Sequence, residues 1–310
     1  MQAKTEVFSK LLREIEMEIG SRDLADLVFK SLITAVNSLD VKDVDFFNGE
    51  FSKLVKLVSQ TEPRYGILNY YFAKLSKFTE QTICPDGKCR VKWKNMFVSE
   101  VKTILGHGDK QRLEILKNSE KIDLEGKTIL IHDHSHTVQD VLVHNKNMGK
   151  HFRVIIAEQN LEKTHDNIER MYGAEIPFQV VPAYMLSHLH DEIDMVFFGA
   201  VTMKSTIDFV MAPGDHGIIS EFHVVGVPLY MFIDTSKFSL WKSEKKVEVF
   251  MHKHERKHCS KPITYERIKY SHDRVPAKLF TQIVTNQGIF DPAGIKKLFL
   301  EKMEKYQIEI

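Results

Sequence analysis

The sequence predicts an α/β protein in which an N-terminal helical domain precedes a doubly wound, mostly parallel, Rossmann-like sheet domain. Four continuous apolar runs follow one another within residues 127–200, and such runs are typical of strands buried on both faces. Amphipathic segments lie between them, which is the pattern of parallel strands joined by crossover helices. Ahead of the runs, apolar residues recur at helical spacing over residues 5–37.

The helical domain is expected to span residues 1–115 and the sheet domain residues 116–310. Gly20 and Ser21 break the first apolar pattern into two helices, and Ser21 is a candidate N-cap. Residues 107–122 carry many charges, so we expect a connection into the sheet domain there. Further helices are expected over residues 45–59, 65–78 and 93–106.

The sheet domain is expected to contain about six strands, and its ligand site should follow from their order. In an open sheet of this kind ligands bind beyond the carboxyl ends of the strands, which directs attention to residues 132–136, 158–160, 199–204 and 234–237. Strands are predicted to begin near Thr128, Arg153, Phe178, Met195, Leu229 and Leu279. Helices are predicted over residues 137–147, 162–172, 184–192 and 218–225.

Composition gives no sign of a strongly charged partner. Lysine and arginine total 43 against 42 aspartates and glutamates, a net charge of +1, so there is no electrostatic argument for nucleic acid or a membrane surface. The three cysteines form no regular framework, which favours a reducing compartment. The sequence shows neither a signal-peptide core nor a long apolar run. We therefore expect a cytoplasmic protein.

Histidine is the unusual residue, with 15 in the chain. One group, His132-Asp133-His134-Ser135-His136, follows the first predicted strand. Alternate histidines there can bind a divalent ion, but later strand ends offer Pro182 and Ala200 rather than ligands, so we favour polar turn residues. A second group lies in a lysine-rich segment that we interpret as a solvated connection, and comprises His252, His254, Glu255, His258 and Cys259.

The remaining motifs are weak. Cys84 and Cys89 frame a turn, but no second pair with ligand spacing follows, so we interpret them as loop thiols and expect no metal. No phosphate-binding or dinucleotide-binding glycine motif occurs, and no G-x-S-x-G elbow. The turn at residues 212–217 contains Gly214 and Asp215. It can present backbone N–H groups to an anion, or it is a tight loop before a helix.

Six short motifs in a fixed order carry a resemblance to a known family. They occupy residues 129–132, 157–160, 194–200, 228–232, 236–238 and 285–292. In this order the chain resembles the alpha, beta and delta regulatory subunits of translation initiation factor 2B, which share a fold with methylthioribose-1-phosphate isomerase and ribose-1,5-bisphosphate isomerase. The resemblance covers the C-terminal two-thirds, and the N-terminal part only in architecture.

The departures from that family bear on chemistry. The isomerases have a Cys directly after the first-strand His and an Asp after the fourth-strand Gly-Ala, where this chain has Asp133 and Val201. Their Asn-Lys pair is replaced by Met211-Ala212, and their Arg-Gly signature is reduced to Arg22 and its neighbours. The resemblance therefore implies no catalytic residues. It implies a degenerate pocket of His132, Asp133, His134, Ser135, His136, Glu158, Gly199, Gly214 and Asp215.

The resemblance implies an alpha-subunit-like, non-catalytic regulatory protein with a sugar phosphate or nucleotide in its pocket. It implies a homodimer and binding of partner subunits or a translation factor. We also expect no cofactor, no direct binding of nucleic acid and no membrane. The alternative is a sugar-phosphate (aldose-ketose) isomerase rebuilt around Asp133, His134 and His136, and a third hypothesis is a metabolite sensor. Apolar residues proposed for the dimer interface are Phe209, Val210, Met211, Ile218, Ile219, Phe222 and Tyr230.

Overall fold

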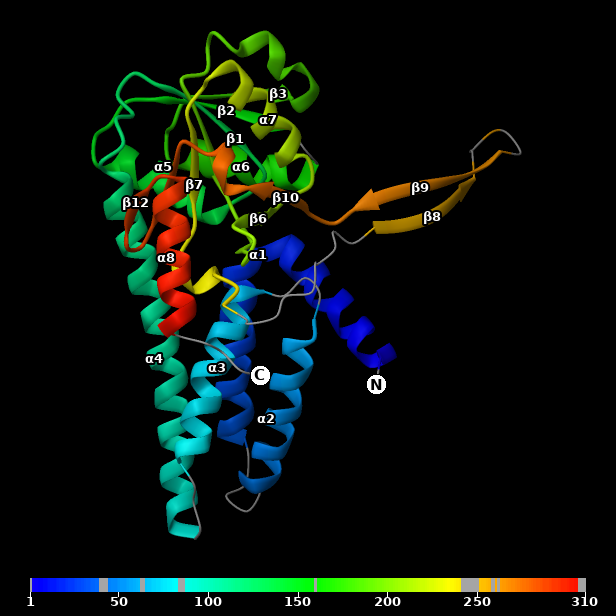
Figure 1. Cartoon of the computed structure of the whole chain (residues 1–310), viewed down its shortest axis with the longest axis vertical. Coiled ribbons are helices and arrows are strands. Elements are labelled where there is room, and N and C mark those ends of the chain that lie inside the picture. Colours follow the sequence, from blue (N-terminus) through cyan, green and yellow to red (C-terminus); the bar gives the residue numbers. More distant parts are fainter. Residues whose placement is uncertain are drawn as a thin grey trace.

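Long helices gather at one end of the molecule and a mostly parallel sheet at the other (Figure 1). The computed structural model describes residues 2–38, 44–61, 65–82, 87–158, 161–240, 251–257, 260 and 263–305. Among the described residues, no helix has the length and apolarity needed to cross a membrane. The predicted fold class, helices followed by a mostly parallel sheet, is confirmed.

Four helices build the N-terminal part: α1 (Gln2–Ser38), α2 (Val44–Ser59), α3 (Gly66–Gln81) and α4 (Gly87–Ser119). Their shared core contains a group of aromatic rings, in which Trp93 and Phe97 are stacked with centroids 5.1 Å apart. The predicted break in α1 is present, but Gly20, rather than Ser21, takes the non-helical conformation, with φ 78° and ψ 161°. The N-cap therefore falls on Gly20, one residue before the expected Ser21.

Residues 107–122 lead into the sheet part as expected, but the helix predicted to end at residue 106 continues through them to Ser119. Ile104 is buried in the helical core and Ile115 in a core of the sheet part. One helix thus packs into both cores, and burial of its apolar positions outweighs the local charge of the segment. The division of the chain near residue 115 stays our proposal.

The main sheet has the strand order β12-β11-β7-β4-β1-β2-β3, and its neighbours are parallel except for the antiparallel pair β11–β12. Five predicted strand starts are confirmed, and the sixth is wrong. Ala277–Leu279 form a 3₁₀ turn, so that strand begins at Gln282. The strands are β1 (Thr128–His132), β2 (Arg153–Glu158), β3 (Phe178–Pro182), β4 (Met195–Gly199), β7 (Leu229–Phe232), β11 (Gln282–Thr285) and β12 (Gly288–Phe290).

Helices cover both faces of this sheet, because successive strand residues point to opposite sides. Ile129 and Ile131 lie in the core under α4, α5 (His136–Asn147) and α6 (Leu161–Gly173). Leu130 lies in the core under α7 (Asp215–Val225) and α8 (Pro292–Lys305). The helix predicted at residues 184–192 is instead a 3₁₀ segment, Ala183–Leu189, in keeping with the short β3–β4 connection.

Among the described residues, five strands lie outside the main sheet, and none of them was predicted. Three form a small antiparallel sheet: β5 (Thr202–Met203), β6 (Asp208–Met211) and β10 (Asp273–Pro276). The other two, β8 (Met251–Lys257) and β9 (Thr264–Tyr270), form a hairpin. The second histidine group was expected on a solvated connection, but its first three residues belong to β8. His258, Cys259 and Cys84 lie outside the described residues, and Cys89 is in α4 rather than in a loop.

The residues proposed for a dimer interface are part of the protomer's own interior. Five of the seven, Phe209, Met211, Ile218, Ile219 and Phe222, are buried in the core under one face of the main sheet. Val210 is buried outside that core, and Tyr230 packs partly buried on the other face of the sheet. Their apolar character is therefore explained by intramolecular packing. The homodimer stays a prediction, and it requires a different surface.

Candidate functional site

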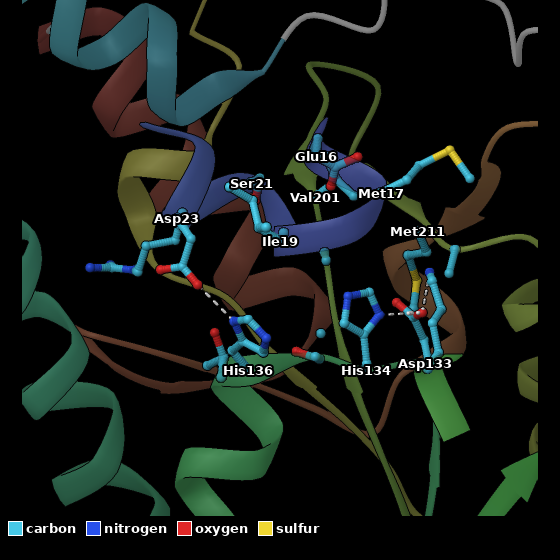
Figure 2. A pocket seen from close by; sticks show the side chains of 18 of the residues that line it. Glu16, Met17, Ile19, Ser21, Asp23, Asp133, His134, His136, Val201 and Met211 are labelled. Atoms are coloured by element: carbon cyan, nitrogen blue, oxygen red, sulfur yellow. Dashed lines mark hydrogen bonds and ion pairs between the residues drawn. The ribbon is translucent and has the colours of Figure 1, made fainter. Parts of the chain in front are cut away.

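A cavity of about 350 Å³ lies where α1 passes over the carboxyl ends of β1 and β4. This volume is within the range of small-molecule sites. Figure 2 shows Glu16, Ile19 and Ser21 of α1 on one side, with His134 and His136 on the other. The kink at Gly20 lines the cavity, so the bend in α1 shapes its roof.

The structure gathers some of the predicted site residues and separates others. Those that line the cavity are Asp133, His134, Ser135, His136, Gly199 and Val201. His132, Gly214 and Asp215 do not line it, but lie together nearby. Glu158 is exposed at the end of β2 and is also absent from the lining. In the part of the chain that the structure describes, no three His, Cys, Asp or Glu side chains are placed to hold a metal ion.

His132 and Asp215 form a buried pair beside the cavity. Their Nδ1 and Oδ1 atoms lie 2.6 Å apart, and Asp215 Oδ2 also accepts from the backbone N–H of Ala212 at 3.0 Å. Burial raises the pKa of Asp215 to about 6, although the hydrogen bond to His132 opposes this. Burial acts to lower the pKa of His132, but the hydrogen bond and charge of Asp215 raise it overall. The pair ties the end of β1 to the start of α7.

Asp133 is held as a carboxylate by its neighbours. Its Oδ1 accepts from Lys163 Nζ at 2.7 Å and from His134 Nδ1 at 3.2 Å. Burial alone would raise the pKa of Asp133, but these two partners lower it well below its ordinary value. A carboxylate in this state can attract a cation or accept a hydrogen bond, but it has no proton to donate near neutral pH.

Ser135 is the N-cap of α5, and the N-terminus of that helix lines the cavity. The Oγ of Ser135 accepts from the backbone N–H of Val138 at 3.5 Å. A Cβ at Gly199 would collide with this hydroxyl, so β4 and α5 approach so closely only because residue 199 is glycine. The start of a helix carries partial positive charge and unpaired N–H groups, which favour a bound anion.

Three histidines of the sheet part contact α1 across the cavity. His134 Nε2 donates to the carbonyl of Glu18 at 3.1 Å, and the Nδ1 of His136 lies 2.8 Å from Asp23 Oδ2 (Figure 2). The third, His272, has Nε2 3.4 Å from Glu16 Oε2. The pKa of His134 is raised, because its bond to Asp133 outweighs burial. Sequence reasoning missed His272 and its acidic partner, since nothing local connects them.

The further basic residues that line the cavity include Lys237 and Arg22. Lys237 is buried, and its Nζ donates to the carbonyl of Ala200 at 2.9 Å. Burial lowers the pKa of this lysine. Arg22 pairs with the buried Asp234 at 2.8 Å. Because Ala200 follows Gly199, Lys237 approaches the same corner of the cavity as the start of α5.

The glycine-rich turn is not open to an external anion. The backbone N–H groups of Gly214 and His216 both donate to Asp273 Oδ2, at 2.9 Å each. The protein's own carboxylate therefore occupies the donors that we expected an anion to use. The helix after this turn begins at Asp215, three residues earlier than predicted.

Comparison with known proteins agrees with this architecture. The chain is 23% identical to the alpha subunit of translation initiation factor eIF2B from Dictyostelium discoideum over 308 residues, covering 94% of this chain and 93% of that protein. It is 32% identical to the delta subunit from Schizosaccharomyces pombe over 124 residues, 39% of this chain. That match spans only 26% of the delta subunit.

Solved structures with a similar fold include the Pyrococcus horikoshii translation initiation factor eIF-2B, with a TM-score of 0.71 and 18% identity, covering 92% of this chain and 97% of that one. Another is the tetrameric eIF2B-beta2-delta2 complex of Chaetomium thermophilum, with a TM-score of 0.67 and 15% identity, covering 97% and 94%. The profile of the initiation factor 2 subunit family matches residues 18–292. This match includes most of the helical part, the main sheet and most of the residues that line the cavity, and the chain belongs to the initiation factor 2 subunit family.

Proposed function

We propose that this protein is a non-catalytic, alpha-subunit-like regulatory member of the family that binds a phosphorylated sugar in the cavity without isomerising it. The proposal rests on the residues at two positions. The related isomerases resemble one another in having a Cys at the first position and an Asp at the second. Here one is the ion-paired Asp133 and the other is Val201, whose side chain packs against the helical core.

The chemistry of an aldose-to-ketose isomerisation explains why this matters. The reaction needs a base within about 3 Å of the carbon-bound proton and an acid beside the carbonyl. Val201 exchanges no proton. Asp133 has a pKa well below its ordinary value, because His134 and Lys163 stabilise the carboxylate, and a carboxylate this weakly basic is a poor base for a carbon acid.

The same cavity retains features that suit an anion. The N-terminus of α5 at Ser135 and the buried amine of Lys237 approach one corner, joined through the Gly199–Ala200 backbone. A phosphate placed there would accept hydrogen bonds from backbone N–H groups and from an ammonium, and such charge-assisted hydrogen bonds are strong. Binding without turnover is the behaviour expected of this arrangement.

A combined binding and turnover experiment tests the proposal. Calorimetry should detect binding of ribose 1,5-bisphosphate or methylthioribose 1-phosphate to the wild type, while product analysis finds no isomer. Lys237→Met should weaken binding at least tenfold, whereas Lys297→Met, an exposed lysine of α8, should not change it. Failure of both sugar phosphates to bind would remove the sugar-phosphate part of the proposal.

The alternative function, an isomerase rebuilt around the histidines, has one observation in its favour. His134 and His136 face the cavity, and imidazoles are competent acids and bases. The variant Asp133→Cys/Val201→Asp distinguishes the two functions. If the wild type isomerises ribose 1,5-bisphosphate at a rate that this variant does not exceed, the protein is an enzyme and the regulatory proposal is wrong.

We also propose that the protein acts in the cytoplasm as a homodimer or together with partner subunits. A relative of similar fold was crystallised as a tetrameric beta2-delta2 complex, which supports assembly through this fold. Light scattering of the purified chain at micromolar concentration should give twice the monomer mass of 36.0 kDa. A monomer mass would contradict the homodimer and leave only assembly with other subunits.

A further inference from the structure

The hairpin of β8 and β9 extends away from both cores of the molecule (Figure 1). Its strands are antiparallel, with Arg256 opposite Tyr265 and Lys257 opposite Thr264. Every residue of β9 is exposed. A two-stranded hairpin without a packed face is only marginally stable in water, so contact with a partner would stabilise this ribbon.

One face of the hairpin is cationic and aromatic. Side chains alternate along a strand, so Tyr265, Arg267 and Lys269 point to the same side. Arg256 shares that side, because directly opposed residues of an antiparallel pair lie on one face. All four side chains are exposed, and Tyr265 retains 49% of its accessible surface.

The charge of this region differs from that of the whole chain. Residues 241–270 contain nine lysines and arginines against four glutamates, whereas the entire chain has a net charge of +1. The remaining residues are therefore net acidic. The expectation that the protein does not bind nucleic acid rested on the total charge, and that total conceals a local basic segment.

We propose that the face formed by Arg256, Tyr265, Arg267 and Lys269 binds single-stranded nucleic acid. Alternate residues of a strand are about 7 Å apart, twice the rise of about 3.4 Å per residue, which lets successive cations reach successive phosphates of an extended strand. The tyrosine ring offers a surface on which an unpaired base stacks.

The exposed ring of Tyr265 favours a single strand over a duplex. Paired bases are stacked on one another and have no face available to Tyr265. The major groove of an RNA duplex is too deep and narrow for side chains to read. Both RNA and DNA single strands present the phosphates and base faces that these residues require, so the experiment compares the two.

The test is fluorescence anisotropy with labelled 12-nucleotide RNA and DNA strands of unstructured sequence. With the three cations each neutralising one phosphate, the logarithm of the binding constant should fall with the logarithm of salt concentration with a slope of about −2. Arg267→Ala and Lys269→Ala should each reduce that slope by about 0.7. Tyr265→Ala should weaken binding about 5- to 100-fold without changing the slope, because it removes stacking rather than charge.

Matched variants keep the result specific to this face. Three control variants should bind as the wild type does. Lys297→Ala removes an exposed lysine elsewhere, and Thr264→Ala alters the opposite face of β9. Tyr265→Phe keeps the aromatic ring. The proposal is overturned if neither strand binds at low salt, or if the hairpin variants bind as tightly as Lys297→Ala does. Two results together also overturn it: Tyr265→Ala binds the strand as tightly as the wild type does, and polyglutamate displaces the labelled strand as well as unlabelled nucleic acid does. The face would then suit an acidic protein. Circular dichroism of each variant verifies that the cores remain folded.

Discussion

Asp133 occupies a left-handed backbone conformation, with φ 63°, at the residue that directly follows β1. Aspartate and asparagine tolerate this conformation better than other residues with a side chain. Its backbone carbonyl accepts from Asn167 Nδ2 at 2.9 Å, while its carboxylate faces Lys163. The backbone conformation and the charge of Asp133 are thus held by separate contacts. A substitution can therefore remove the charge without changing the backbone conformation.

Asp133→Asn should remove the charge and keep the backbone conformation. We expect it to lower the free energy of unfolding by about 1–3 kcal/mol at pH 7, because a partly buried bond between charged groups is lost. The pKa of Asp133 is lower in the folded state than its ordinary value of 3.8. Its contribution is therefore full above that value and is lost as pH falls through the folded-state pKa.

Urea denaturation at pH 7 and in acid measures this effect. The difference between wild type and Asp133→Asn should shrink below the ordinary pKa of an aspartate. Asp191→Asn, an exposed aspartate, provides the control and should change stability by less than about 0.5 kcal/mol. A loss that stays equal at both pH values would show that Asp133 stabilises the fold by something other than its charge.

At the scale of single elements, the kink in α1 is the feature on which the cavity depends. Gly20 has φ 78° and ψ 161°, a combination that is essentially confined to glycine. The bend places Glu18 and Asp23 on either side of the kink against His134 and His136. A straight helix could not make both contacts in this way.

Gly20→Ala should therefore be costly even though no atom lies within 4 Å of the added Cβ. The expected loss is about 1–3 kcal/mol of stability from backbone strain, together with weaker sugar-phosphate binding as the roof shifts. Gly106→Ala, inside α4 and also without a neighbour within 4 Å, is the matched control. It should stabilise the protein by about 0.5–1 kcal/mol. Equal effects of the two alanines in thermal unfolding would rule out strain at the kink.

Elements with a local signature could be predicted, and those defined by distant partners could not. The continuous apolar run at residues 128–132 identified β1, and Gly20 identified the break in α1. By contrast, the residues of β9, Thr-Tyr-Glu-Arg-Ile-Lys-Tyr, show no regular alternation of apolar and polar side chains. The start of β11 shifted to Gln282 because the turn before it is fixed by a bond from Phe280 N–H to the Ala277 carbonyl, which nothing in the sequence indicated.

The candidate site follows the same rule. The sequence placed His134 and His136 at the end of a strand, which is where they lie. It could not show that α1, more than 100 residues earlier in the chain, supplies their partners. Nor could it show that Asp273 already fills the turn at Gly214, because that contact depends on the pairing of β10 with β6.

At the scale of the whole molecule, the helical and sheet parts meet through close and polar contacts. A Cβ on Gly66, the first residue of α3, would collide with the backbone carbonyl of Lys237. The hydroxyl of Thr202 donates to that same carbonyl at 2.7 Å. Next to this contact, Arg22 of α1 reaches Asp234 after β7, 212 residues further along the chain.

The Arg22–Asp234 pair should be a major determinant of how firmly the two parts are joined. Arg22→Met leaves Asp234, whose side chain is 3% exposed, without its charged partner, and removing one member of a buried pair costs about 3–5 kcal/mol. Arg22→Met/Asp234→Leu removes both charges. It should lose clearly less than the sum of the two single variants, with a coupling of about 0.5–3 kcal/mol, because each single variant already loses the Arg22–Asp234 interaction.

The surface pair Lys53–Glu50 supplies the comparison, since its atoms are 2.6 Å apart but its side chains are 75% and 48% exposed. Solvent screens such a pair, so Lys53→Met should cost less than about 1 kcal/mol. Urea denaturation of the four variants and the wild type measures the change in the free energy of unfolding that each substitution causes. If Arg22→Met cost no more than Lys53→Met, solvent would have to reach Asp234 readily, and the contact between α1 and the sheet would be looser than its burial implies.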